Sequence, residues 1–94
     1  MTVMSSKQIL VLIDKNNKKI RDKYFDSVIA MLSDYKTSEA MSIYLDNDLF
    51  IDDAELALGD DITSALNDEI FEKLYSIFKD VAEHEGLICD EQNY

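Results

Sequence analysis

With 94 residues, the chain is long enough for one domain with a single modest core. Apolar residues make up 47% of it and nine residues are Phe or Tyr, which excludes a disordered acidic tail. The formal net charge of −11 disfavours direct binding to nucleic acid or to an anionic membrane, because both are negatively charged. The chain has no proline and only two glycines, so its composition favours helices.

The first half of the chain predicts three helices. The first is expected at 6–16, capped by Ser5 or Ser6, although the β-branched run at 9–13 also fits a strand. The second, at 18–35, has apolar residues every three or four positions, which predicts one buried stripe. The members of this stripe are Ile20, Tyr24, Phe25, Val28, Ile29, Leu32 and Tyr35. A short third helix is expected at 38–46 after Thr37 or Ser38.

The second half predicts a short acidic helix and a long final one. Asp48 can cap a helix at 49–58, and Gly59 follows where a left-handed residue is typical. Asp60 or Asp61 can start the last helix, expected at 61–85, with Gly86 ending it and Leu87 folding back. The sequence therefore predicts an all-α fold: one domain, 1–94, of about four helices with an additional short acidic helix.

Cellular location and assembly are also expected from the residues. Cys89 is the only cysteine, which excludes an internal disulfide and fits a reducing cytoplasm. The longest apolar run near the start, Ile9 to Ile13, is too short for a signal-peptide core or a membrane span. We expect a soluble cytoplasmic monomer, or at most a salt-sensitive dimer.

Negative charge is concentrated in the middle of the chain. Residues 1–36 carry seven bases and four acids, whereas residues 37–72 carry eleven acids and no Lys or Arg. Such a field attracts a basic protein surface, although a merely solvated face is the alternative. Tyr44 and Phe50 lie among these acids and are candidates for an exposed interface centre, unless they pack under the short helix. The candidate partner-binding residues are Tyr44, Asp46, Asp48, Phe50, Asp52, Asp53, Glu55, Asp60 and Asp61. By contrast, Phe25, Phe71 and Phe78 lie on apolar stripes and are expected in the core.

Motifs for catalysis or cofactor binding are missing from the sequence. An EF-hand counted from Asp46 places Ile51, and one counted from Asp48 places Asp53, where glycine is required. One histidine and one cysteine cannot form a closed zinc site within a chain. His84 better fits the last turn of a helix, where it interacts with terminal carbonyls, than a nucleophilic pair with Cys89. We therefore expect no enzyme, no metal and no cofactor.

The run "LYSIFKDVAEHEGLI", residues 74–88, is similar to the "F…EH..G…LI" arrangement that follows an acidic helix in the colicin-nuclease immunity family. The whole chain also resembles small, acidic, helical immunity proteins of nuclease bacteriocins and contact-dependent toxins. The family's tyrosine pair, in a run like "YYP", is replaced here by "CDEQNY", so no contact residue is transferred. The resemblance implies a nuclease inhibitor that occludes the substrate surface of a basic toxin.

Two other classes of function fit the same composition. A phage-encoded inhibitor of a restriction or CRISPR enzyme could imitate DNA with its carboxylates, but seven acids form a short imitation unless a dimer extends them. An acidic structural or adaptor domain is the second alternative. The position of the gene, beside a toxin gene or among phage genes, would distinguish these classes.

Overall fold

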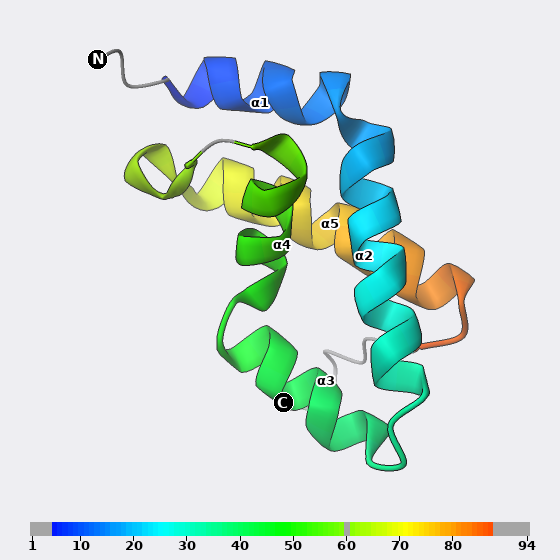
Figure 1. Ribbon diagram of the computed structural model, residues 1–94. Helices are drawn as coiled ribbons and strands as arrows, with labels where there is room; N and C mark the ends of the chain where they lie inside the picture. Colours follow the sequence, from blue (N-terminus) through cyan, green and yellow to red (C-terminus); the bar gives the residue numbers. More distant parts are fainter. Residues whose placement is uncertain (1–4, 60, 88–94) are drawn as a thin grey trace.

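The computed structural model describes residues 5–59 and 61–87, and it is helical throughout this part of the chain except for its turns (Figure 1). Its elements are α1 (Ser6–Lys15), α2 (Asn17–Leu32), α3 (Thr37–Asp46), α4 (Leu49–Leu58), a 3₁₀ turn η1 (Thr63–Ala65) and α5 (Asp68–His84). The predicted all-α bundle is confirmed, and residues 9–13 are helical, which excludes the alternative strand. The short acidic helix lies at the predicted residues 49–58.

The N-terminal helices begin and end at local hydrogen bonds. Ser5 caps α1 through a capping box, in which its hydroxyl accepts from the Gln8 N–H and the Gln8 side chain accepts from the Ser5 N–H. The α2 helix ends at Leu32 rather than at the predicted residue 35. Asp34 accepts a hydrogen bond from the Lys36 N–H, and the Thr37 hydroxyl donates to the Asp34 carbonyl. This local turn competes with another helical turn.

The junction between α3 and α4 differs from the prediction at its caps. Asp48 occupies the N-cap position of α4 but makes no side-chain cap hydrogen bond, so that part of the prediction is wrong. Its backbone is left-handed, with φ 52°, and its carbonyl rather than its carboxylate accepts from the Ile51 N–H. No side chain caps α3 either, where Thr37 or Ser38 was expected. Gly59 ends α4 in the predicted left-handed conformation, with φ 75°.

The last helix begins seven residues later than the predicted position 61. Asn67, not Asp60 or Asp61, is its N-cap, and the Asn67 side chain accepts from the Ile70 N–H at 2.9 Å. Ile62 is fully buried before this helix starts, so the segment that leads into α5 is shaped by core packing as well as by helix propensity. At the other end, the Leu87 N–H donates to the Ala82 carbonyl and the Gly86 N–H to the Glu83 carbonyl. These two bonds form the predicted Schellman ending.

The core lies where α2, α4 and α5 meet, and it contains several aromatic rings. The Phe78 ring of α5 stacks on Tyr44 of α3 at 4.9 Å and meets Tyr24 of α2 edge-on at 5.6 Å. Phe50 of α4 packs against the partly buried Phe71 at 5.1 Å. The Tyr24 hydroxyl donates to the Phe50 carbonyl, so its polar end is satisfied inside the core.

The predicted stripe on α2 is only partly buried. Ile20, Tyr24, Val28 and Met31 form its buried face. Phe25 is 42% exposed, so its assignment to the core is wrong, and three further members of the stripe are also exposed, namely Ile29, Leu32 and Tyr35. The sequence stripe was too wide because α2 packs against α4 and α5 on one side only, and Tyr35 lies beyond the helix end.

Candidate functional site

The two aromatic residues of the acidic segment belong to the core. Tyr44 is 7% exposed and Phe50 is 1% exposed, and both rings contact Phe78. The prediction that they form an exposed interface centre is therefore wrong, and the packing alternative is correct. Both residues lie on the inner faces of amphipathic helices, where burial of their large apolar area outweighs the acidic neighbours in sequence.

Asp53 also points inward rather than towards a partner. One of its carboxylate oxygens accepts hydrogen bonds from the Tyr44 hydroxyl at 2.7 Å and from the Ser27 hydroxyl at 2.6 Å. Burial raises the pKa of Tyr44, and the hydrogen bond to Asp53 acts in the same direction. Asp53 thus joins α2, α3 and α4 through one half-buried carboxylate, which gives this acid a structural role.

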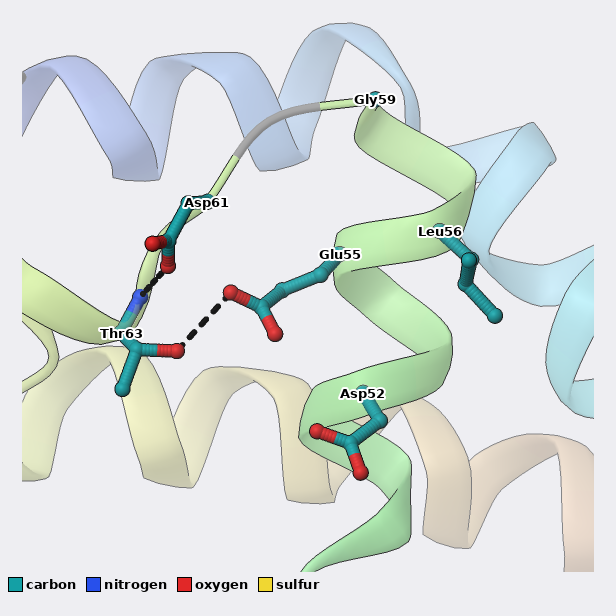
Figure 2. Close-up of a pocket in the computed structure, with 6 residues that line it drawn as sticks. All are labelled: Asp52, Glu55, Leu56, Gly59, Asp61 and Thr63. Carbon is teal, nitrogen blue, oxygen red and sulfur yellow. Dashed lines mark hydrogen bonds between the residues drawn. The ribbon is translucent and has the colours of Figure 1, made fainter.

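Glu55 holds the segment after α4 in place. One of its carboxylate oxygens accepts from the Ile62 N–H at 3.0 Å and from the Thr63 hydroxyl at 2.8 Å, as Figure 2 shows for the hydroxyl. Because Ile62 is buried in the core, this carboxylate fixes the return of the chain beside α4. Its exposed side faces the hollow described below.

Asp61 lies on the opposite wall from Glu55 (Figure 2). Its carboxylate accepts from the Thr63 N–H at 2.9 Å. This hydrogen bond holds the pKa of Asp61 below its usual value. Asp61 is therefore an exposed anion at neutral pH.

These residues line an open hollow between α4 and the segment that follows it. The hollow has a volume of about 640 Å³, and we call it the acidic hollow; its lining residues are Asp52, Glu55, Leu56, Gly59, Asp61 and Thr63. Three carboxylates from two separate segments line the hollow, with Asp52 and Glu55 on α4 and Asp61 on the loop after it (Figure 2). The structure thus brings together three of the nine predicted site residues.

Leu56 is the part of this surface that the sequence analysis missed. Its side chain is 70% exposed and points away from Glu55 and Asp61 at the edge of the hollow (Figure 2). The signal was present in the helical period, because Leu56 follows Asp52 by four residues and therefore shares its outward face. Leu56 is thus an exposed apolar side chain beside the carboxylates, whereas Tyr44 and Phe50 are buried.

Three of the remaining predicted acids, Asp46, Asp48 and Asp60, do not belong to the described lining of the hollow. Asp46 ends α3 and Asp48 precedes α4, and both are exposed without lining the hollow. Asp60 lies outside the described residues. Within 5–59 and 61–87, none of Asp46, Asp48, Asp52 and Asp61 forms an ion pair with a cationic side chain. Their charge is therefore not neutralised by the described part of the chain.

The described residues do not form a metal site of their own side chains. Among the residues that the structure places, no group of three or more His, Cys, Asp or Glu side chains is arranged to hold a metal ion. His84 is exposed in the last turn of α5, as predicted, and lines a hollow with Arg21 and Phe25. Cys89 lies outside the described residues, so the expectation that it forms no nucleophilic pair with His84 stays a prediction.

Comparison with protein families, with curated proteins and with solved structures finds no match to this chain. Over the described ranges, none of the helices combines the length and the apolar character needed to cross a membrane.

Proposed function

We propose that this protein is a non-enzymatic inhibitor that binds a basic, nucleic-acid-acting protein and covers its substrate surface. The observation that carries the proposal is a set of exposed carboxylates on α4 and on the residues that flank it, which form no ion pair within the described part of the chain. These carboxylates are Asp48, Asp52 and Asp61, and Asp52 and Asp61 both line the acidic hollow. Their mutual repulsion destabilises the folded chain unless a cationic surface relieves it.

The chemistry of the surface favours a protein partner over nucleic acid. Negative potential repels phosphate groups, whereas it steers lysine- and arginine-rich surfaces into contact at high rates. Leu56 adds an apolar centre beside the acids, and a buried apolar anchor with a charged rim is typical of protein interfaces. A partner that binds nucleic acid offers such a cationic surface, so the inhibitor and the nucleic acid would compete for it.

The resemblance to nuclease immunity proteins supports a toxin nuclease as the partner. It also accounts for the absence of catalytic motifs, since occlusion requires affinity and no chemistry. Two partly buried acids are less available for contact with a partner, because Asp53 and one oxygen of Glu55 already accept hydrogen bonds within the fold. The proposed contact residues are therefore Asp48, Asp52, Leu56 and Asp61, with Asp46 at the periphery.

Capture from the source lysate tests the proposal. The variant Asp48→Lys, Asp52→Lys, Asp61→Lys should lose the partner. A control with Glu72→Lys and Glu83→Lys on α5 and Glu85→Lys at its C-cap has the same change in net charge and should keep the partner. The captured partner should bind a nucleic acid in the free state and lose that binding when the wild-type protein is added. Equal capture by both variants, or a complex that still binds nucleic acid, would contradict the proposal.

A further inference from the structure

A second hollow lies on the other side of Leu56, between α2 and α4. It has a volume of about 420 Å³, and its lining residues are Lys19, Asp22, Lys23, Asp26, Leu56 and Ala57. Leu56 lines both this hollow and the acidic hollow, so it forms the ridge between them. The two hollows differ in charge, because the second contains two lysines and two aspartates and is neutral overall.

The charged residues of this second hollow are mostly without partners. Asp22 pairs with Lys18 at 2.8 Å. In the described part of the chain, Lys19, Lys23 and Asp26 form no ion pair, although all three belong to the same face of α2. Four charges of alternating sign, two of them positive and two negative, therefore line a groove with an exposed leucine at its edge.

The order of these charges makes the face complementary to itself. When two copies of a helix pack antiparallel about a twofold axis, each residue faces a residue on the opposite side of the axis. An axis midway between Asp22 and Lys23 places Lys19 of one copy opposite Asp26 of the other. The same axis places Asp22 opposite Lys23, so every one of the four contacts joins opposite charges.

We propose that a second copy of this chain docks on the groove between α2 and α4, through an antiparallel contact of the two α2 helices. Leu56 of each copy flanks the contact and supplies apolar area beside the ion pairs. The groove is neutral, whereas the chain as a whole has a charge of −11, so this face opposes self-association less than any acidic face would. Exposed ion pairs are weak, so we expect weak association, with a dissociation constant of about 1 mM.

The dimer would also extend the acidic surface. Because Leu56 separates the two hollows, the acidic hollows of the two copies would lie on the outer sides of the contact. This consequence is separate from the partner proposal, and the dimer is tested without any partner.

The experiment measures association of the purified chain by sedimentation equilibrium at up to about 1 mM. Wild type should associate, and Lys19→Asp should weaken association at least about tenfold, because it creates two symmetric contacts between like charges. The double variant Lys19→Asp, Asp26→Lys should restore association, since it exchanges the two signs at each contact. A control, Lys7→Asp on α1, changes the net charge as Lys19→Asp does and should associate like wild type.

Three results would overturn the dimer. The first is a wild type that stays monomeric at about 1 mM. The second is Lys19→Asp associating as strongly as the Lys7→Asp control. The third is a folded double variant that fails to recover association. A circular dichroism melt of each variant distinguishes a lost contact from a lost fold.

Discussion

Two neighbouring acids, Asp52 and Asp53, have opposite roles, and replacing each by alanine tests this division. Asp53→Ala removes the acceptor of two hydrogen bonds, from the Tyr44 and Ser27 hydroxyls. Asp52→Ala removes an exposed carboxylate that lines the acidic hollow and has no cationic partner in the described residues. The sequence gives no reason for two adjacent aspartates to differ in their contribution to stability.

The expected cost of Asp53→Ala follows from the burial of its partners. The Tyr44 side chain is almost fully buried, so its hydroxyl would lose its acceptor at a cost of about 1–3 kcal/mol. Ser27 is half-buried and can partly recover with water, which adds roughly 0.5 kcal/mol. We expect a total loss of about 2–3 kcal/mol, or a drop in Tm of roughly 10–20 °C for a domain of this size. Asp52→Ala should change stability by no more than ~0.5 kcal/mol.

Urea denaturation followed by circular dichroism measures both variants. Together with Tyr44→Phe, the double variant Tyr44→Phe, Asp53→Ala completes a mutant cycle. The loss of stability in the double variant should be smaller than the sum of the losses in the two single variants by about 1–2 kcal/mol. If Asp53→Ala is as stable as Asp52→Ala, the inward role of Asp53 is refuted. A coupling of zero between Tyr44 and Asp53 would have the same meaning.

Further predictions concern pH, caps and termini. Burial raises the pKa values of Tyr24 and Tyr44, so both side chains lose their protons at a lower pH in the unfolded chain than in the folded chain. Above pH ~10 the free energy of unfolding should therefore fall by about 1.4 kcal/mol per pH unit for each tyrosine. Tyr44→Phe should reduce this slope in alkaline urea titrations. Asn67→Ala should cost about 1 kcal/mol in thermal melts because it removes the cap of α5, whereas Ser76→Ala, at an exposed position on the same helix, should cost less than ~0.5 kcal/mol. Gly86→Ala should destabilise the fold by about 1–2 kcal/mol, because alanine is strained at the φ of 91° that Gly86 adopts. An added methyl group would contact no neighbouring atom, so the backbone conformation accounts for the whole loss. An unchanged thermal melt would contradict the Schellman ending.

Most of the helices were predictable because their signals are local. Apolar spacing, Ser5 and the two glycines predicted the class of fold, the acidic helix and the ending of α5. The start of α5 was not predictable from the same signals. Asp60, Asp61 and Asn67 are all good N-caps by residue type, and the choice depends on burial of Ile62 and its hydrogen bond to Glu55, which are tertiary contacts.

The candidate site was less predictable, because the orientation of a side chain depends on which faces of a helix are covered. Sequence position grouped Tyr44, Phe50 and Asp53 with the exposed acids, but these three residues face the core. Phe25 shows the converse error, since it lies on an apolar stripe and remains exposed. The fraction of α2 that neighbouring helices cover is set by packing, which helical periodicity alone does not encode.

The central claim, that the exposed acids bind a basic partner, is tested most directly by one affinity measurement. It compares the binding of the captured partner to wild type and to the variant Asp48→Lys, Asp52→Lys, Asp61→Lys. Titration calorimetry at two salt concentrations should show wild-type binding that weakens as salt increases, because the contact is electrostatic. The variant should bind at least about a hundredfold more weakly, since like charges would then meet at the interface, while its far-UV circular dichroism stays helical. A folded variant with wild-type affinity and wild-type salt dependence would contradict the claim, and the exposed acids would then be a solvated surface only.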